Sequence, residues 1–232
     1  MLKKLPNQYI SLWQWLIIAI ILFGYAIYNA LALFTLPFVN TAESTVFSTG
    51  DNYIALVIQS LLLLTLFLYL RYIQFDWRSL PFRWEWRSLW QAVVIFVITS
   101  LLIDIVTGLY HGFLPLQWLH VFSNIRNALA SIDLSLIIYS LFNGIYEELF
   151  FLGLCFAVKP SQRVYAVLFS LLIRCAFHLY QGLEYTLYIG IIMGIVYITL
   201  YRYWQSRNLL TFFIAHALSD IFGLSVLYYF SQ

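Results

Sequence analysis

Long apolar runs, separated by short polar or basic segments, recur along the whole chain. Each run holds about 19–25 residues, and a helix of that length, rising about 1.5 Å per residue, crosses a hydrocarbon core of about 30 Å. The pattern therefore predicts an all-α, polytopic membrane helical bundle with about seven transmembrane helices. We place these spans at residues 11–35, 53–72, 88–108, 132–156, 163–182, 185–203 and 209–230.

The basic residues predict how these spans are oriented. Of the 12 lysines and arginines, Arg126 falls in one set of connecting segments, Arg174 falls within a span, and the other ten fall in the alternate set. Segments rich in Lys and Arg stay on the cytoplasmic side of a membrane. We therefore expect a cytoplasmic N-terminus and an external C-terminus, with these residues in the cytoplasm: Lys3, Lys4, Arg71, Arg78, Arg83, Arg87, Lys159, Arg163, Arg202 and Arg207.

No repeat, low-complexity segment or linker divides the chain, so we expect a single membrane domain over residues 1–232. The first apolar run is too long for the hydrophobic region of a signal peptide and lacks a small-residue cleavage site, which predicts a retained span. Residues 112–131, with Pro115 and Trp118–His120, fit the seven-span pattern least well. A re-entrant segment or an additional helix is the alternative there.

The composition narrows the function classes. Hydrophobic residues make up 63% of the chain, charged residues 9%, and the net charge is +2, so we expect the lipid bilayer as a partner and no nucleic acid. Cys155 and Cys175 lie in or beside apolar runs without metal-type spacing, and we predict that they are packing residues rather than a disulfide. Nothing in the pattern indicates an oligomeric state.

Ionisable residues inside the predicted spans are few, and they are grouped. Arg174 and His178 are four residues apart in one span, as are His216 and Asp220 in another, and this spacing places both members of a pair on one helix face. A charge at bilayer depth is costly unless it is paired, neutralised or wetted. The complete intramembrane set is Asp104, Glu147, Glu148, Arg174, His178, His216 and Asp220.

Three of these spans place their polar residues at similar depth. Counted from the nearest flanking basic residue, Glu147, His178 and His216 lie about 18, 22 and 14 Å along their helices. The side chains of Glu147 and Glu148 diverge by about 100° around a helix axis, so we expect the two residues to have different roles. The depths permit one common site near the middle of the membrane.

Each residue also has a purely structural explanation. A single membrane histidine is commonly an interhelical hydrogen-bond partner. Asp104, near the outer end of its span, is expected to cap or tie a neighbouring helix. Helix packing explains the joint set poorly, so we expect a buried polar site. Outside it, His111 and His120 are expected at the surface, and the G-x-x-x-G spacing that begins at Gly190 is expected to serve close helix packing.

Three motifs follow one another in the second half of the chain. They read E-E-L-F-F-L from Glu147, R-C-A-F-H up to His178, and H-A-L-S-D from His216. In order, spacing and placement they resemble the E-E-x-x-x-R, F-x-x-x-H and H-x-x-x-N/D motifs of the CPBP family of intramembrane proteases, which includes CAAX-prenyl-protease-2-like enzymes and bacteriocin-processing and immunity proteins. By this resemblance residues 131–232 hold the catalytic core spans, whereas residues 1–130 carry no matching motif.

The chain departs from the family pattern at two positions. Leu152 stands where the family has arginine, and Arg174 stands where it has phenylalanine. One cation is thus lost from one span and gained on the next. We hypothesise that Arg174 pairs with Glu148 and supplies from a neighbouring helix the charge that the missing arginine would supply.

The resemblance implies an intramembrane endopeptidase of glutamate type, with Glu147, Glu148, His178, His216 and Asp220 as catalytic residues. Glu147 with His178 would activate a water molecule, while His216 with Asp220 would face the developing oxyanion, Asp220 orienting His216 or donating when protonated. No serine or cysteine stands beside a histidine as covalent catalysis requires. No cofactor is expected. Zinc held by His178, His216 and a glutamate is the alternative, although no H-E-x-x-H helix is present.

Two other function classes stay open. A proton-coupled transporter would also place ionisable residues at mid-membrane, although it would usually show internal pseudo-symmetry or broken helices. A catalytically impaired family member could act as a membrane regulator or immunity protein. The expected partner is a peptide or protein substrate within the membrane, namely a lipidated protein, a peptide precursor or a membrane-protein segment. The expected location is a bacterial plasma membrane, which is an inference by analogy.

Overall fold

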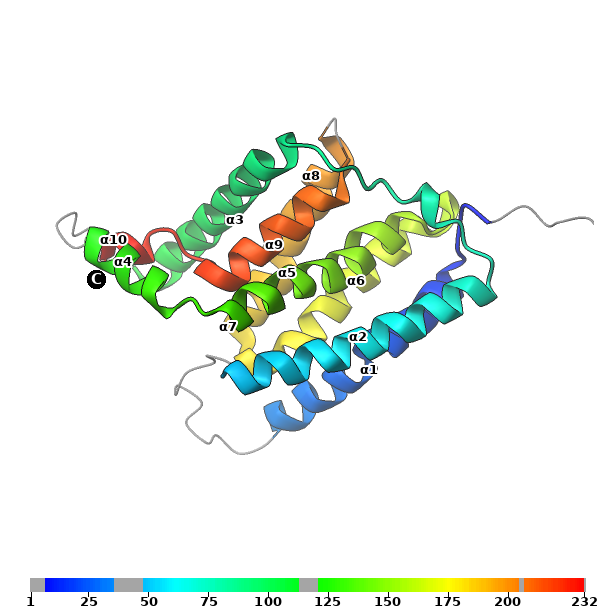
Figure 1. The fold of residues 1–232 in the computed structure, drawn as a ribbon, viewed down its shortest axis with the longest axis horizontal. Coiled ribbons are helices and arrows are strands. Elements are labelled where there is room, and N and C mark those ends of the chain that lie inside the picture. The colour runs from blue at the N-terminus through cyan, green and yellow to red at the C-terminus, as the bar shows by residue number, and fades with distance from the viewer. Residues whose placement is uncertain (1–6, 36–47, 113–120, 205–206, 232) are drawn as a thin grey trace, which may run out of the picture.

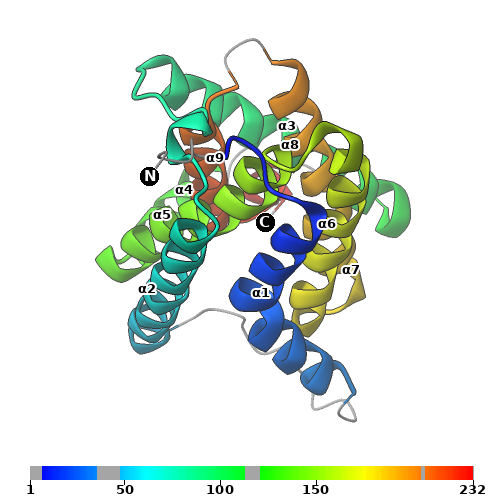
Figure 2. The ribbon, with the colours of Figure 1, turned by 90° about the vertical axis from the view of Figure 1, so that its right-hand side faces the viewer.

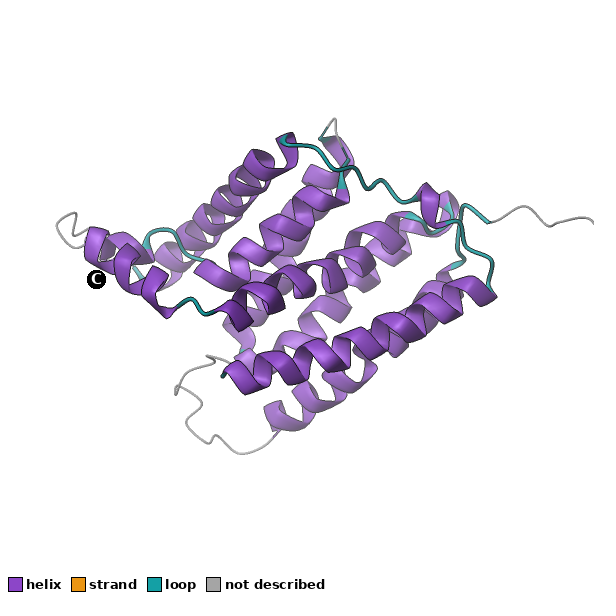
Figure 3. Cartoon of the chain, viewed as in Figure 1, coloured by secondary structure: helices purple, strands orange, loops and turns teal. Residues whose placement is uncertain are grey.

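The computed structural model describes residues 7–35, 48–112, 121–204 and 207–231 of the chain. Within these ranges it consists of helices joined by short connections and has no strand, apart from isolated bridges that pair Asn7 with Phe75 and Ile10 with Val158 (Figure 3). The α-helices are α1 (Leu12–Thr35), α2 (Thr49–Tyr72), α3 (Arg87–His111), α4 (Val121–Ser131), α5 (Leu134–Glu148), α6 (Arg163–His178), α7 (Leu183–Leu187), α8 (Gly194–Tyr203), α9 (Leu209–Phe222) and α10 (Tyr228–Ser231).

Shorter helical turns of other types continue or precede several of these helices. The 3₁₀ turns are η1 (Trp77–Ser79), η4 (Pro160–Gln162) and η5 (Leu179–Gln181). Two π-helical turns, η3 (Leu149–Leu154) and η6 (Tyr188–Met193), extend α5 and join α7 to α8.

Six helical segments of the described chain are long and apolar enough to cross a membrane. They are Leu12–Thr35, Thr49–Tyr72, Arg87–His111, Leu134–Leu154, Pro160–Gln181 and Leu183–Tyr203. These segments match the first six spans predicted from the sequence. The protein is therefore an all-α, polytopic membrane helical bundle.

The seventh predicted span, residues 209–230, is not one continuous helix, and this prediction was wrong. α9 has 14 residues and ends at Phe222, after which Gly223 adopts a φ of 78°. At about 1.5 Å per residue, α9 covers about 21 Å, which is short of the hydrocarbon thickness. Asp104 of α3 then accepts hydrogen bonds from the backbone N–H groups of Val226 and Leu227, both at 2.9 Å, and thereby holds the turn that precedes α10.

The segment that fitted the span pattern least well contains an additional helix. This helix is α4, which includes Arg126 and packs against α10 near the C-terminus (Figure 1). Residues 113–120, which include Pro115, Trp118 and His120, lie outside the described residues. The alternative of an extra helix between residues 112 and 131 is thus confirmed.

The central helices are α5, α6 and α9, and the N-terminal pair covers them on one side. α5 packs most extensively against α9, while α1 packs against α6 and α2 packs against α5. Figure 2 shows α1 beside α6 and α2 beside α5 in the end-on view. The motif-bearing helices therefore form the middle of the bundle, with α1 and α2 on one side and α3 and α8 on the other (Figure 1).

An aromatic cluster attaches α1 to the motif-bearing helices. The rings of Trp15 and Phe150 stack with centroids 4.6 Å apart, and Phe23 lies 4.9 Å from Phe177 and 5.1 Å from Phe151. Four of these five side chains are at most 1% exposed, and Phe177 is 9% exposed. Aromatic side chains bury large apolar areas, so this cluster fixes where α1 lies against α5 and α6.

Glycines allow the central helices to approach one another closely. A Cβ atom on Gly144 would lie 2.3 Å from the backbone oxygen of Phe213 in α9. A Cβ atom on Gly190 would lie 2.3 Å from the sulfur of Cys175, and one on Gly194 would lie 2.6 Å from Leu171 in α6. The G-x-x-x-G spacing therefore serves close helix packing, as predicted from the sequence.

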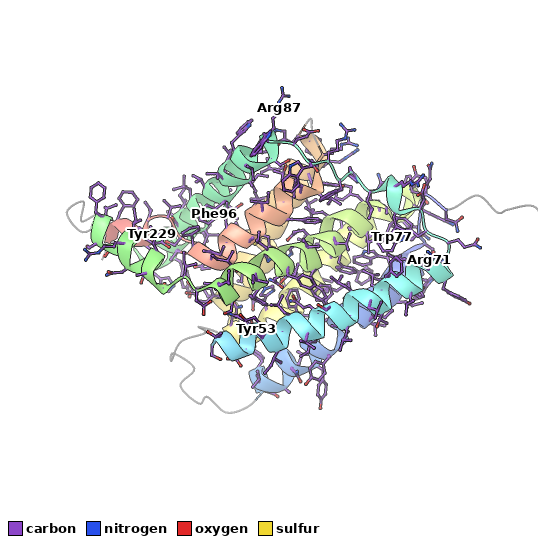
Figure 4. The ribbon with its side chains drawn as sticks, viewed as in Figure 1. Tyr53, Arg71, Trp77, Arg87, Phe96 and Tyr229 are labelled. Atoms are coloured by element: carbon purple, nitrogen blue, oxygen red, sulfur yellow. The ribbon has the colours of Figure 1, made fainter. Side chains whose placement is uncertain are left out.

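The two ends of the bundle differ in their side chains. In Figure 4, Arg71 and Trp77 lie on the right and Arg87 at the top, whereas Tyr229 lies on the left and Tyr53 at the bottom, near the start of α2. The described N-terminal segment begins at the right-hand end and the C-terminus lies at the left (Figure 1). The first and last described segments are thus at opposite ends, in agreement with an odd number of passages along the bundle.

Candidate active site

Glu147 and Glu148 are the last two residues of α5, where the helix changes into the π-helical turn η3. Their side chains are buried, with 4% and 0% of their surface exposed. A π-helical turn shifts the residues that follow it around the helix axis, and such turns are frequent at functional sites. The paired glutamates of the first motif therefore lie at an irregular point of the central helix.

Glu148 is bound by a cation from the neighbouring helix. Nη2 of Arg174 in α6 donates hydrogen bonds to both carboxylate oxygens of Glu148, at 2.8 and 2.9 Å. The guanidinium carbon of Arg174 lies 4.1 Å from the ring centroid of Phe151, within the range of a cation–π contact. The hypothesis that Arg174 pairs with Glu148 is confirmed.

His216 of α9 lies between the two glutamates. Its Nδ1 is 2.7 Å from Oε1 of Glu148, and its Nε2 is 3.7 Å from Oε1 of Glu147 and 3.6 Å from Oδ1 of Asp220. Because Glu148 is held as a carboxylate by Arg174, Nδ1 of His216 must donate the proton of this hydrogen bond. The divergence of the two glutamates thus brings them to different nitrogens of one imidazole ring.

His178, the last residue of α6, has its ring orientation set by its own helix. Its Nδ1 lies 2.8 Å from the backbone oxygen of Arg174. A carbonyl oxygen only accepts, so Nδ1 is the donor and Nε2 is the nitrogen that accepts in the neutral ring. This geometry leaves Nε2 of His178 able to accept a proton.

Asn143 joins the cluster, although the sequence analysis missed it. Its Nδ2 lies 3.0 Å from Oδ2 of Asp220, 3.2 Å from Oε1 of Glu147 and 3.4 Å from Nε2 of His216. Two hydrogens on Nδ2 cannot serve three acceptors at once, and the contact to Asp220 is the shortest. Asn143 precedes Glu147 by four residues, so the spacing that singled out the other pairs was present here also. The search was restricted to ionisable residues and passed over it.

A large cleft reaches this cluster from between the N-terminal helices and the central ones. Its volume is about 1160 Å³, and α1, α2, α5 and α9 all contribute to its wall. Glu147, His178, His216 and Asp220 line it, whereas Glu148 does not. The structure therefore brings four of the five predicted catalytic residues to one cleft and places Glu148, with Arg174, behind them.

One oxygen in this cleft has no partner in the described part of the protein. Oε2 of Glu147 is buried and accepts no hydrogen bond, whereas Oε1 of the same carboxylate is within 3.2 Å of Asn143. Buried polar atoms are nearly always paired in native proteins. Glu147 therefore offers a carboxylate oxygen to whatever occupies the cleft.

A metal ion is the alternative use of the same atoms. Glu147, Glu148 and His216 each offer a ligand atom, and these atoms lie within 4.8 Å of one another. His178, which the sequence analysis named as a zinc ligand, is not part of this group. Two of the three ligands are already hydrogen-bonded to each other, and Arg174 places a positive charge on Glu148. A divalent cation would have to displace the first contact and tolerate the second.

The other residues singled out from the sequence have structural roles. Asp104 ties the C-terminal turn, as expected of a cap. His111 is exposed and lies 2.8 Å from Glu184. Cys155 and Cys175 are both free, which agrees with their prediction as packing residues.

Comparison with known proteins bears on the same part of the chain. Residues 130–222 match the family model described as Rce1-like, type II CAAX prenyl endopeptidase. The matched segment begins at the end of α4, ends with α9, and includes all three motifs. No match was found among curated proteins or among solved structures. The motif-bearing part of this multi-pass membrane protein is thus similar to type II CAAX prenyl endopeptidases, which agrees with the CPBP-type membrane proteases that its motifs resemble.

Proposed function

We propose that the protein is an intramembrane endopeptidase in which Glu147 activates a water molecule for attack on a substrate peptide bond. The observation that carries this proposal is the position of Glu147. Its carboxylate is buried, lines the cleft, and keeps Oε2 free of any hydrogen bond from the described protein. An unpaired carboxylate oxygen beside a cleft is suited to take a proton from water.

The proton then has a defined path. Water gives its proton to Oε2 of Glu147 as its oxygen attacks the carbonyl carbon, and Glu147 returns that proton to the leaving amine when the carbon–nitrogen bond breaks. Nε2 of His178, the accepting nitrogen of a ring that lines the same cleft, holds the attacking water in position. These two residues are the groups that touch the water.

His216 and Asn143 stabilise the negative charge that develops on the carbonyl oxygen. Glu148 binds Nδ1 of His216, so the second nitrogen, Nε2, is the one presented near Glu147 and Asp220. When Nε2 carries a proton, it donates to the oxyanion, and the amide nitrogen of Asn143 lies 3.4 Å away as a second donor. Asp220 orients both groups, because it accepts from Asn143 and faces His216.

The pair formed by Arg174 and Glu148 positions His216. Arg174 keeps Glu148 charged, and the charged carboxylate fixes the ring through a 2.7 Å contact. The relocated arginine therefore restores what the missing arginine at Leu152 would supply. This compensation favours an active enzyme over an impaired family member that acts as a regulator or immunity protein.

A zinc-dependent protease is the second candidate, because Glu147, Glu148 and His216 are grouped closely enough to share an ion. We infer a mechanism without metal, since Glu148 and His216 already bind each other and Arg174 binds both oxygens of Glu148. Zinc, if bound, would polarise the carbonyl and activate the water.

We further propose that the substrates are membrane-associated: lipidated proteins, peptide precursors or membrane-protein segments. The apolar walls of the cleft, which include Leu33, Ile58 and Leu62, support an apolar substrate. The setting that we propose by analogy is a bacterial plasma membrane. The distribution of basic residues supports a cytoplasmic N-terminus there.

The decisive experiment measures peptide cleavage by the purified protein in lipid nanodiscs. The probes are fluorescence-quenched apolar peptides, with and without a prenylated cysteine near the C-terminus. We expect cleavage that falls by about 10²–10⁴-fold in Glu147→Gln, the range that a general base contributes. Glu184→Gln is the matched control, because Glu184 is a carboxylate that does not line the cleft.

Three results would overturn parts of the proposal. Full activity in Glu147→Gln would remove Glu147 as the general base. Inhibition by a chelator, reversed by zinc, would establish the metal-dependent mechanism instead. Peptide binding without any cleavage, unchanged by Glu147→Gln, would identify the protein as a binding member of the family.

A further inference from the structure

Helix α2 carries two amide side chains on the cleft side. Asn52 and Gln59 are seven residues apart, which is about two helical turns, so they lie on the same face of α2. Both line the cleft that leads to Glu147. They are uncharged, lie outside the three motifs, and have no part in the chemistry described above.

Contacts with α5 fix the orientation of both amides. Nδ2 of Asn52 donates to Oγ of Ser135 at 2.9 Å, and Ser135 in turn donates to Oδ1 of Asp133 at 2.8 Å. Because the serine proton is committed to the carboxylate, Asn52 must present its nitrogen to Ser135. The carbonyl oxygen of Asn52 is thereby turned away from α5.

The orientation of the Gln59 amide is likewise fixed by its hydrogen-bond partner. Its Nε2 donates to Oδ1 of Asn143 at 2.7 Å, while Nδ2 of Asn143 faces the carboxylates of Glu147 and Asp220. A carboxylate needs a donor, so Asn143 cannot be reversed, and Gln59 must present its nitrogen to it. The carbonyl oxygen of Gln59 therefore takes no part in the contact with Asn143.

The carbonyl oxygens of both amides are buried acceptors without a partner in the described protein. Oδ1 of Asn52 and Oε1 of Gln59 have no hydrogen bond from the described protein. An unpaired buried acceptor is costly, and the cost is recovered when a ligand supplies a donor. With Oε2 of Glu147, the cleft thus presents three unpaired oxygens and needs a ligand that carries several donors.

The distance between Asn52 and Gln59 along α2 indicates which kind of ligand can supply hydrogen-bond donors to both. Seven residues of helix separate them by about 10.5 Å, and three residues of a polyproline II chain span about 9.3 Å, with N–H groups three apart pointing to the same side. A peptide in an α-helix has its N–H groups engaged, whereas an extended peptide leaves them free. An extended main chain is therefore the ligand that satisfies both oxygens together.

We propose that Asn52 and Gln59 bind main-chain N–H groups of a substrate segment that lies extended in the cleft along α2. The proposal rests on the proposed endopeptidase function and adds how the substrate is held. Gln59 contacts Asn143, so the N–H group that it binds lies near the scissile bond, and Asn52 binds the chain farther toward Thr49. Binding through main-chain N–H groups positions an apolar substrate independently of the identity of its side chains.

The test compares the binding of two probes to Glu147→Gln protein in nanodiscs, a background in which cleavage is blocked. One probe is a fluorescent apolar peptide of about twelve residues, and the other is the oligoester of the same sequence, in which every backbone N–H is replaced by oxygen. Each lost hydrogen bond is expected to weaken binding about fivefold, so the peptide should bind about 25-fold tighter than the oligoester.

The variants assign this preference to the two amides. Gln59→Leu and Asn52→Leu should each reduce the peptide-to-oligoester preference about fivefold, and the double variant should abolish it. Oligoester binding should stay constant, which shows that the cleft is still formed. Ser60→Leu is the matched control on α2, because Ser60 is exposed and does not line the cleft. If Gln59→Leu fails to fold, Gln59→Met serves the same purpose.

The outcomes separate this proposal from the proposed function. A preference that persists in the double variant, or no preference in the parent, would overturn main-chain binding by α2 even if the protein cleaves peptides. A preference that the two substitutions remove would support it even if no peptide is ever cleaved, and the proposed function alone would then fail.

Discussion

Arg174 of α6 binds both carboxylate oxygens of Glu148 of α5 through one nitrogen, Nη2, at 2.8 and 2.9 Å. Both side chains are almost fully buried, at 2% and 0% exposure. The positive charge that the family pattern places one turn beyond Glu148, at the position of Leu152, thus comes from a neighbouring helix. The pair joins two helices and fixes His216 of a third.

Removing this arginine should strongly destabilise the protein. In Arg174→Met, the carboxylate of Glu148 loses its counter-charge in a buried site, and breaking a buried pair in this way costs about 3–5 kcal/mol. A double-mutant cycle with Glu148→Gln, followed by unfolding in detergent, should give a coupling energy well above the scatter of the measurement. Coupling near zero would mean that the pair contributes nothing.

A double substitution that moves the arginine from position 174 to position 152 serves as a control for this cycle. Leu152 is fully buried in the cluster that contains Tyr197, and Tyr197 also lies 6.0 Å from the guanidinium of Arg174. Leu152→Arg combined with Arg174→Phe restores the family arrangement and should recover much of the stability and activity. Leu152→Arg in the unaltered background should instead destabilise, because it adds a second buried cation.

Asn143 should be required for turnover, although it carries no charge. Asn143→Ala removes the amide donor that faces Glu147, His216 and Asp220, and loss of one oxyanion donor lowers kcat by about 10²–10³-fold. Asn143→Asp, although isosteric, should be more damaging, because it adds a carboxylate to a group that already has several. Asn29→Ala, at another cleft position, should leave kcat unchanged. Wild-type activity in Asn143→Ala would show that donation by this amide is not required.

Gly144 should tolerate no larger residue. In Gly144→Ala, the new Cβ atom would lie 2.3 Å from the backbone oxygen of Phe213, so α5 and α9 must separate. Overpacking of this kind costs about 1–3 kcal/mol, and the shift would also move Glu147 away from His216. Gly24→Ala in α1 is the matched control, since its Cβ atom would meet a side chain at an ordinary 3.5 Å. Thermal unfolding and cleavage rates together check this prediction.

Asp133 should stabilise the protein in a pH-dependent manner. It caps α5 and accepts hydrogen bonds from the backbone N–H of Leu136 and from the hydroxyls of Thr49 and Ser135, which lower its pKa below the usual value for aspartate. A group whose folded pKa is lowered stabilises the protein above its unfolded pKa, and this stabilisation is lost as the pH falls through the folded pKa. Asp133→Asn should therefore lower the Tm at pH 7 and have a much smaller effect near pH 3.

The control for Asp133 lies at the opposite end of the bundle. Asp76 caps η1 through the backbone N–H of Arg78 but makes no contact with the cleft. Asp76→Asn should leave peptide affinity unchanged, whereas Asp133→Asn loosens the contact with Thr49 at the cleft wall and should weaken it. A pH-independent difference between wild type and Asp133→Asn would contradict a role for the ionised carboxylate.

The termini should lie on opposite sides of the membrane, with the N-terminus in the cytoplasm. The first and last described segments lie at opposite ends of the bundle, and Arg71, in the last turn of α2, lies at the end where the first described segment begins (Figure 4). Reporter fusions to each terminus should show cytoplasmic activity for the N-terminal fusion alone. Cytoplasmic activity of the C-terminal fusion would contradict this topology.

Much of the fold could be predicted from the sequence because membrane spans are defined by length and apolarity, which are local properties. The pairing of Arg174 with Glu148 was also predictable, since a charge lost at one position and gained at another must be balanced where water is absent. The i,i+4 spacing predicted which residues share a helix face. It could not predict which neighbouring helix each face meets.

The end of α9 was decided by tertiary structure. The apolar run continues past Phe222, but Gly223 takes a positive φ and Asp104, more than a hundred residues earlier in the sequence, binds the chain that follows. A composition window cannot detect such a contact, because it depends on how α3 lies beside α9. The span predicted for residues 209–230 was therefore too long.

Tertiary structure also decided which neutral amides belong to the site. Asn143 and Gln59 look like ordinary polar residues in apolar helices, and only the packing of α2 on α5 and of α5 on α9 brings them together with Glu147 and His216. The sequence by itself determined the first six long apolar helices, the charges buried within the spans and the motif spacing. The tertiary structure decided which oxygens and nitrogens face one another across the helices, because hydrogen bonds depend on distances of a few ångströms that helix periodicity alone does not set.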